Sequence, residues 1–474
     1  MNRIRLIISF SLISGFGFSG LFLSSCKKKS FEGSIVFTQV KAGDVNLAAQ
    51  VPARQKLQSG IAALSPDKSG SQPVLLTKEF YSARSPEISN DGTRMLFSAQ
   101  QKQDDPWQIW EMEPGNLKSR KVISLAENCS DPAYLPNGRV IFSKQSLKDN
   151  TDSGFDIVSC NSDGSDVRQV TFNPYSYSAS TVLKDGRVLA ISKHLNSGAD
   201  AVFMVLRPDG TKNELFYNPS AGSHPAGRGW ETENGKIVFV ESDKSKADYG
   251  KLISINYSHP LHSCANLSSS IEGDFISVFP LKTGKFLVAY RKSESDRFGL
   301  YEFDPENRAL GKAVYENKDF DIAEVVAAEK RERSRKLPSE VDMGVKTGLI
   351  LCQDVNFHDL GISLDARLTG VNKIRIMGRD STLGEIDVEK DGSFYLKVIA
   401  DTPFQIQAID DMGNMVGKPC EWIYIRPNER RGCIGCHEDH ELVPENIVSL
   451  AVKHAPVSIP VHISKVVEKK VSLE

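Results

Sequence analysis

The residues best suited to chemistry lie near the C-terminus, where Cys433 and Cys436 are followed directly by His437. Two thiols at this spacing can add to the two vinyl groups of a haem, and the adjacent imidazole can ligate the iron from one face. Gly432 and Gly435 carry no side chain and would let the backbone approach the macrocycle closely. The motif therefore predicts a covalently attached haem c that is held by Cys433, Cys436 and His437.

Zinc is the alternative cofactor for this segment. Cysteine thiolates and imidazoles are common ligands of zinc, and His437, His440, His454 or His462 could complete such a site. A thioredoxin-like redox motif would require a βαβ setting, which the surrounding sequence lacks. A plain structural disulfide would leave the adjacent histidine unexplained. We therefore expect haem first and zinc second.

A second axial ligand for the iron has to come from another part of the chain. No methionine follows the motif, since the last one is Met415, and His440 is too close in sequence to reach the opposite face of a haem easily. His454 follows a predicted short helix that spans residues 444–453 and begins with a proline at a favourable first-turn position. We predict His454 as the distal ligand, with an open iron site as the alternative.

The N-terminus has the features of an export signal. Two arginines within the first five residues precede an apolar stretch over residues 6–23, and small residues then lead to Cys26. This order is typical of a bacterial lipoprotein, so we expect residues 1–26 to be the signal peptide and Cys26 to receive the lipid. An uncleaved membrane anchor is the alternative, because the stretch is about long enough to span a bilayer. The predicted location is the cell envelope, with a soluble periplasmic or surface-exposed body, and Lys27 in place of an aspartate favours the outer membrane.

Composition sets limits on the class of protein. A chain of 474 residues exceeds one ordinary domain, and 40% apolar residues are sufficient for real cores. The 58 basic and 60 acidic residues nearly cancel, leaving a net charge of -2. This balance removes any general electrostatic argument for nucleic-acid binding.

Turn dipeptides that end in glycine recur through the middle of the chain at intervals of 46 to 49 residues. Each turn leads into a β-branched or aromatic run, as at residues 140–142 and 237–240, which is a hairpin signal. Further runs on either side bring each repeat to four strands, the number in a propeller blade. The five turns are Asp91-Gly92, Asn137-Gly138, Asp185-Gly186, Asn234-Gly235 and Thr283-Gly284.

Six first strands can be counted, but the last repeat lacks the strands that should follow it. The first strands lie near Pro86, Pro132, Ser180, Pro225, Ile276 and Ile322. The missing strands are available before the first repeat, at residues 35–38, 61–64 and 74–77. We therefore predict an all-β fold with a six-bladed β-propeller over residues 31–328, whose last blade is closed by N-terminal strands.

The pattern changes beyond the propeller. Residues 329–343 are rich in charge and are predicted to be a solvated linker. Short alternating strands without the long period then fill residues 344–430, which indicates a small β-sandwich-like domain. Residues 431–474 form the predicted haem segment.

Two resemblances follow from these residues. Ser85 to Gly92 resembles the core of the TolB-type propeller repeat. Asp391 to Phe394, Trp422 to Pro427 and Arg431 to Glu438 resemble the hydrazine synthase alpha-subunit family. The resemblance implies a six-bladed propeller joined to a β-rich haem-bearing region, with Cys433 and Cys436 as the thioether cysteines.

The chain departs from this family in its haem motifs. The family enzyme is similar but holds two haems in this subunit, and a tyrosine after the motif ligates iron while the motif histidine helps to bind zinc. Here a single motif is present and no tyrosine follows His437. The resemblance then implies that His437 ligates iron directly or shares zinc with His440, in a relative of unknown reaction.

Three functions are compatible with the sequence. The first is a cell-envelope c-type haem lipoprotein that transfers electrons to a redox partner protein or handles a small nitrogenous or oxygen ligand. The second is a haem oxidoreductase, with hydrazine synthesis itself not expected. The third is a propeller-based module that binds a protein or glycan and carries a structural zinc site.

Overall fold

The computed structural model describes residues 32–41, 58–65, 71–148, 152–194, 200–246, 249–357, 370–435, 441 and 447–460. Strands dominate this part of the chain, and its one regular helix is a single 3-10 turn, η1 (Leu450–Lys453). No helix among these residues is long and apolar enough to cross a membrane. The predicted signal peptide, the lipidation site Cys26 and the motif residues Cys436, His437 and His440 lie outside the described residues.

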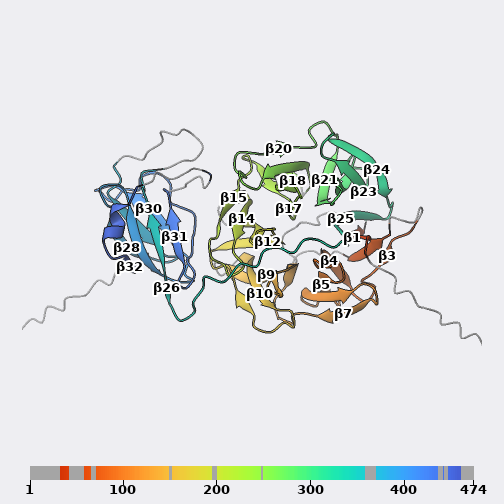
Figure 1. Cartoon of the computed structure of the whole chain (residues 1–474), viewed down its shortest axis with the longest axis horizontal. Coiled ribbons are helices and arrows are strands. Elements are labelled where there is room, and N and C mark those ends of the chain that lie inside the picture. Colours follow the sequence, from red (N-terminus) through yellow and green to blue (C-terminus); the bar gives the residue numbers. More distant parts are fainter. Residues whose placement is uncertain are drawn as a thin grey trace, which may run out of the picture.

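Six antiparallel sheets surround a common axis and form a β-propeller (Figure 1). Blade 1 contains β25 (Phe320–Ala327), β1 (Ile35–Lys41), β2 (Ser59–Leu64) and β3 (Val74–Leu75); blade 2 contains β4 (Ser82–Ile88), β5 (Met95–Gln100), β6 (Gln108–Glu113) and β7 (Lys118–Lys121). Blade 3 contains β8 (Cys129–Tyr134), β9 (Arg139–Lys148), β10 (Asp152–Asn161) and β11 (Arg168–Gln169); blade 4 contains β12 (Tyr175–Val182), β13 (Val188–His194), β14 (Val202–Leu206) and β15 (Glu214–Tyr217). Blade 5 contains β16 (Ser223–Pro225), β17 (Trp230–Glu231), β18 (Lys236–Asp243), β19 (Lys251–Asn256) and β20 (Ala265–Asn266); blade 6 contains β21 (Asp274–Pro280), β22 (Phe286–Arg291), β23 (Gly299–Asp304) and β24 (Ala309–Tyr315). The predicted all-β propeller fold is confirmed.

Blade 1 joins the two ends of the propeller. Strand β25 pairs antiparallel with β1, with Ile35 opposite Ala327 and Lys41 opposite Phe320. The backbone of Ala328 adds hydrogen bonds to Gly33 and Ser34, each 2.8 Å long. Strand β1 therefore pairs on both sides, with β25 and with β2, and this pairing closes the ring.

The glycine turns link the first two strands of the blades. In blade 2, Gly92 has a φ of 74°, a left-handed conformation that glycine adopts without steric cost. Asp91 accepts hydrogen bonds from Ser89 Oγ at 2.6 Å and from Thr93 Oγ1 at 2.7 Å. The hydrogen bond from Ser89, together with those from Thr93, lowers the pKa of Asp91 to about 2. The turn is therefore fixed by its own side chains.

Apolar side chains fill the space within and between the blades. Burial of one such side chain contributes about 1.5–3 kcal/mol, so the repeated pattern stabilises every blade in the same way. Each blade places a fully buried phenylalanine in this core: Phe37, Phe97, Phe142, Phe203, Phe239 and Phe303.

The charged segment after the propeller makes backbone contacts that its prediction as a solvated linker did not include. It crosses one face of the ring toward the second domain (Figure 1). Its backbone bonds to the turns of the blades, with Arg331 N donating to Asn90 O at 2.8 Å and Arg335 N donating to Lys184 O at 2.9 Å. A Cβ added to Gly186 would lie 2.1 Å from Arg335 O. Most side chains of the segment are exposed, as expected for a solvated linker. The sequence did not indicate the backbone contacts, because the charged side chains say nothing of where the backbone donors find acceptors.

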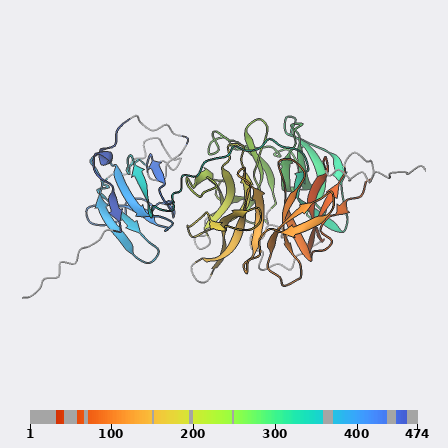
Figure 2. The same ribbon diagram turned by 60° about the horizontal axis from the view of Figure 1, so that its bottom comes forward.

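The second domain contains two sheets that pack face to face. One has the order β31 (Arg430–Cys433), β26 (Thr347–Cys352), β29 (Phe394–Ile399) and β32 (Val457–Ile459). The other has the order β28 (Thr382–Asp387), β27 (Lys373–Met377) and β30 (Gln405–Ile409). Buried residues of both sheets share one apolar cluster that includes Ile350, Leu396, Ile374 and Ile406. Figure 2 shows this β-sandwich-like domain beside the propeller.

Candidate functional site

Cys433 is the last residue of an edge strand in the second domain. Strand β31 pairs in parallel with β26, so Cys433 lies opposite Cys352. The backbone beyond the strand is held as well, because Gln353 N donates to Cys433 O at 2.9 Å and Asp354 N donates to Ile434 O at 3.1 Å. The first cysteine of the motif thus sits at a fixed point of the sheet.

The two glycines of the motif region have different surroundings. A Cβ added to Gly432 would meet no atom of the described residues within 4 Å. A Cβ added to Gly435 would lie 2.3 Å from Phe357 O, so this glycine is required for packing against the protein itself. Open space beside Gly432 and a half-buried Cys433 suit the attachment of a large planar group at this edge.

The described residue that follows the motif contacts the propeller. The carboxylate of Glu441, only 9% exposed, accepts a hydrogen bond from Leu261 N at 2.6 Å and lies 3.4 Å from His259 Nδ1. Both partners belong to the loop between β19 and β20 of blade 5. Residues on either side of the stretch 436–440 are therefore held by different domains, Gly435 by the second domain and Glu441 by the propeller.

His454 precedes β32, which forms the opposite edge of the sheet from β31 and Cys433. Phe394 is opposite Cys352 across β26 and β29, and β32 begins beside Leu396 directly after the η1 turn. The His454 side chain is 71% exposed and its Nε2 is 3.7 Å from Glu389 Oε1. This separation is too long for a hydrogen bond, so the carboxylate does not fix the orientation of the ring.

The helix predicted over residues 444–453 is mostly wrong where the structure describes it. Residues 447–449 are not helical, and Leu450–Lys453 form one 3-10 turn. The turn starts where Leu450 N donates to Asp391 Oδ2 at 2.7 Å and Ala451 N donates to Ser393 Oγ at 3.0 Å. Adjacent Ile447 and Val448 are β-branched and have low helix propensity. The proline at residue 444 was therefore not enough to predict a helix through these positions.

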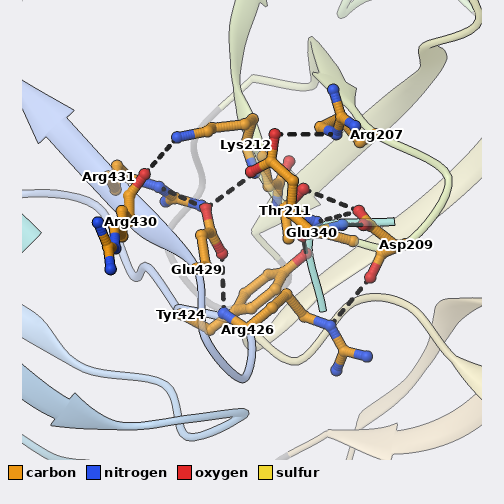
Figure 3. A network of polar contacts seen from close by, with 12 residues as sticks. Arg207, Asp209, Thr211, Lys212, Glu340, Tyr424, Arg426, Glu429, Arg430 and Arg431 are labelled. Carbon is orange, nitrogen blue, oxygen red and sulfur yellow. Dashed lines mark hydrogen bonds and ion pairs between the residues drawn. The ribbon is translucent and has the colours of Figure 1, made fainter. Parts of the chain in front are cut away.

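Glu429 anchors the start of the motif-bearing strand to the propeller (Figure 3). Its carboxylate is fully buried and accepts hydrogen bonds from Lys212 N at 2.9 Å and Arg426 N at 2.8 Å. Arg431 Nη2 donates to the same group at 2.8 Å. Burial alone would lower the pKa of Arg431, but the Glu429 carboxylate raises it above its ordinary value. The strand that ends at Cys433 therefore begins on a buried ion pair.

Neighbouring side chains extend this anchor across blade 4. Tyr424 is buried, and its hydroxyl donates to Gly210 O at 3.0 Å, with Val170 O at 3.2 Å. Arg426 Nε donates to Asp209 O at 3.0 Å. Burial raises the pKa of Tyr424 well above its ordinary value, so its hydroxyl keeps its proton and remains a donor.

The sequence identified the motif but not this anchor. Tyr424 and Arg426 lie in a segment that resembles the family, yet nothing in a single sequence indicates that they contact residues more than 200 positions away. The residue types did give one indication of a buried contact. In the run Trp-Ile-Tyr-Ile-Arg-Pro, polar groups lie on an apolar, strand-like stretch, and such groups need hydrogen-bond partners when they are buried.

Comparisons with known proteins cover both domains. Residues 316–438 match the family profile described as hydrazine synthase alpha subunit middle domain. The curated hydrazine synthase subunit alpha of Kuenenia stuttgartiensis is 23% identical over 496 aligned positions, which cover 77% of this chain and 61% of that protein. The solved structure of Kuenenia stuttgartiensis hydrazine synthase matches with a TM-score of 0.75 at 20% identity, over 89% of this chain and 71% of that chain. TolB from Acinetobacter baumannii matches with a TM-score of 0.45 at 14% identity, over 62% of this chain and 66% of that chain.

The fold defines the class of protein as a six-bladed β-propeller joined to a small β domain. Within that class, the chain is similar to the hydrazine synthase alpha subunit, whose middle-domain family model matches residues 316–438. It spans 61% of the length of the curated relative.

Proposed function

We propose that this protein is a c-type haem lipoprotein of the cell envelope that uses a single covalent haem for electron transfer or for redox chemistry on a small ligand. The observation that carries the proposal is the placement of Cys433 at the fixed end of an edge strand, beside the open space at Gly432. The pairing of β31 with β26 holds the backbone of Cys433 at this edge, so a haem attached there would have a defined position relative to the sheet.

The residues of this chain would divide the work of holding the haem. Cys433 and Cys436 would form the thioether bonds, and His437 would ligate the iron from one face. His454 would be the candidate for a second iron ligand, and its side chain is exposed and available for such a role. A bound haem would supply one-electron chemistry, while the sheet and the Glu429 anchor would keep its attachment point in place.

The rest of the proposal concerns location and partners. The signal over residues 1–26 and the lipid at Cys26 would hold the protein at a membrane surface, with the outer membrane favoured. Electrons would pass to or from a redox partner protein. Hydrazine synthesis itself is not proposed, because a single motif without a following tyrosine departs from the family enzyme.

The test is a pyridine haemochrome spectrum together with a haem-stained denaturing gel. The protein would be made in a host with cytochrome c maturation, as wild type and as Cys433→Ser with Cys436→Ser. We expect covalent haem in the wild type and none in the double variant, because the thioether bonds need both thiols.

Cys264→Ser is the matched control, since Cys264 is an exposed cysteine of blade 5 and should leave the haem signal unchanged. Absence of covalent haem from the wild type, with zinc found by metal analysis, would contradict the proposal. That result would favour a propeller-based protein or glycan binding module with a structural zinc site.

A further inference from the structure

Cys433 and Cys352 lie directly opposite each other on neighbouring strands of the second domain. Strand β31 ends at Cys433 and pairs in parallel with β26, which ends at Cys352. Residues directly opposite in a sheet point to the same face, and neighbouring strands lie about 4.7–4.9 Å apart. Disulfides join residues whose Cα atoms are about 4.4–6.8 Å apart. The strand pairing therefore places the two cysteines within the range of a disulfide.

Both cysteines face the interior of the β-sandwich-like domain. Burial alternates along β26, where Ile350 and Cys352 are each 1% exposed and the residue between them is only half-buried. Cys433 is half-buried and packs against the same apolar cluster that contains Cys352. A reagent in solution can therefore reach Cys433 first, whereas Cys352 is shielded from it.

The backbone around the two cysteines is fixed by hydrogen bonds. Leu349 N donates to Glu429 O at 2.8 Å before the cysteines, and Gln353 N donates to Cys433 O at 2.9 Å where the two strands end. Engineered disulfides often fail because they distort the backbone that they join. Here the strands already lie side by side, so a bond needs only rotation of the two side chains.

The cysteines of the propeller are less suited to a bond with either residue. Cys129 and Cys160 lie in blade 3, and burial raises the pKa of their thiols to about 12 and about 11. Their reactive thiolate forms are therefore scarce at neutral pH. Cys264 is exposed on blade 5, outside the strands that pair with β31.

Cys420 shares the apolar cluster with Cys352 and Cys433, but it lies beside the opposite sheet. Cys420 N donates to Ile406 O at 3.0 Å, and Ile406 N donates to Cys420 Sγ at 2.9 Å. Ile406 belongs to β30, and sheets that pack face to face are about 10 Å apart. This separation exceeds the Cα range of a disulfide, so Cys433 is the better partner for Cys352.

We propose that Cys352 and Cys433 form a reversible disulfide in the haem-free protein. A small disulfide such as oxidised glutathione would react first with the Cys433 thiolate, which gives a mixed disulfide and releases one glutathione. The Cys352 thiolate would then attack the Cys433 sulfur, which forms the protein disulfide and releases the second glutathione. The two protons of the protein thiols pass to the two glutathione thiolates, and the two electrons reduce the glutathione disulfide.

The disulfide would control access to the attachment point of the haem, a consequence that rests on the proposed function. A Cys433 sulfur bound to Cys352 cannot add to a haem vinyl group, so the disulfide would have to be reduced before the thioether bond forms. The proposed export would place both thiols in a compartment where disulfides persist. Reduction of this bond would then be a separate step in the maturation of the protein.

The test is disulfide mapping on the full chain made in a host without cytochrome c maturation. After incubation with oxidised glutathione, the remaining thiols are blocked with N-ethylmaleimide in denaturant, and the unreduced protein is digested with trypsin. We expect peptides 347–367 and 432–453 to be linked by a bond that dithiothreitol breaks. A bond of Cys433 to Cys436 or of Cys352 to Cys420 instead, or no bond to Cys352, would overturn the proposal. Because no haem is involved, this test and the haemochrome test can fail separately.

Variants distinguish the two cysteines of the motif, which lie in one tryptic peptide. Cys436→Ser should keep the link to peptide 347–367, and Cys433→Ser should lose it. Cys420→Ser is the matched control, because Cys420 lies in the same apolar cluster and should leave the link unchanged. Fragment spectra of the linked peptides locate the bond in the wild type without any variant. Loss of the link in Cys436→Ser, with retention in Cys433→Ser, would assign the bond to Cys436 and overturn the inference.

Discussion

Asp91, Asp163 and Asp243 share one local arrangement. Each carboxylate accepts a hydrogen bond from a hydroxyl two residues later, at 2.7 Å from Thr93, 2.7 Å from Ser165 and 2.8 Å from Ser245. Hydrogen bonds from Ser165 and Ser245 lower the pKa of Asp163 and Asp243, as those from Ser89 and Thr93 do for Asp91. Tight turns of the propeller are therefore fastened by ionised aspartates.

The pH dependence of stability follows from these lowered pKa values. An aspartate titrates near 3.9 in the unfolded chain, so the contribution of Asp91 is complete above about pH 4 and is lost as the pH falls through about 2. We expect Asp91→Asn to melt below the wild type at pH 5 and above, with the difference closing between about pH 4 and 2. Thermal unfolding followed by circular dichroism measures this. Asp104→Asn, at an exposed position, is the control, and a difference that stays constant with pH would contradict the prediction.

Glu429 holds the start of β31 through hydrogen bonds to Lys212, Arg426 and Arg431. Glu429→Gln leaves the buried guanidinium of Arg431 without its counter-ion, which we expect to cost about 3 kcal/mol. Hydrogen exchange of peptides from β31 and β26 should then become roughly 100-fold faster, because their local opening becomes easier.

Glu340→Gln is the matched control for this change. Glu340 pairs with Arg207 at 3.6 Å in the same region, but its side chain is largely exposed to solvent. Exposed pairs contribute about 0–1 kcal/mol, so exchange in β31 should change little. Equal effects of the two variants would show that Glu429 has no special role as an anchor.

At the scale of elements, the segment over residues 329–336 forms hydrogen bonds with blades 2, 3 and 4. Its backbone pairs with Asn90 of blade 2 and Lys184 of blade 4, while Arg333 Nη2 donates to Pro136 O of blade 3 at 2.6 Å. A run of charged residues usually indicates a solvated stretch, and most side chains of this segment are indeed exposed. The backbone contacts could not be predicted, because acceptors on distant turns leave no trace in the composition of the segment.

Gly186 of blade 4 lies close to the backbone of Arg335, so a substitution there tests whether the segment rests on the propeller. In Gly186→Ala the new Cβ would lie 2.1 Å from Arg335 O, so we expect the segment to lift from blade 4. Its lysines and arginines should then be cut by trypsin about tenfold faster, since proteolysis requires local release. Limited trypsin digestion with mass spectrometry measures the rate of cleavage within residues 329–336.

Gly138→Ala separates this clash from the cost of the backbone conformation. Gly138 has a φ of 86°, close to the 92° of Gly186, but a Cβ added there would meet no atom within 4 Å. Both variants should lose similar stability through strain, while only Gly186→Ala should expose the segment to trypsin. Equal cleavage rates would contradict the inferred contact.

At the scale of the whole molecule, sequence periodicity was a sufficient guide to the propeller. Turns such as Asn137-Gly138 mark the hairpins directly, since a left-handed turn needs glycine, and apolar runs beside them mark the buried strands. The way in which the second domain contacts the propeller could not be predicted from the sequence. Tyr424, Arg426 and Glu429 bind blade 4 through backbone groups, which carry no sequence signature.

The residues of the candidate site also differ in whether the sequence could predict them. Cys433 could be identified because its motif is local and its chemistry is specific. The anchor beneath it could not, because Glu429 and Lys212 meet only when the second domain has docked on blade 4. A local motif is therefore predictable from the sequence, whereas the contacts that position it are defined by the assembled fold.

The shared blade also sets the order in which the ring can form. Strands β1 and β2 leave the ribosome early, whereas β25, the strand that pairs with β1, follows roughly 300 residues later. At typical synthesis rates of about 5–20 residues per second, the early strands wait for roughly 15–60 s with an open edge. The blades between them can form meanwhile from contiguous sequence, but the final closure depends on a contact of very long sequence separation. Moving β1 to β3 to the end of the chain by circular permutation would make every blade contiguous and remove that delay.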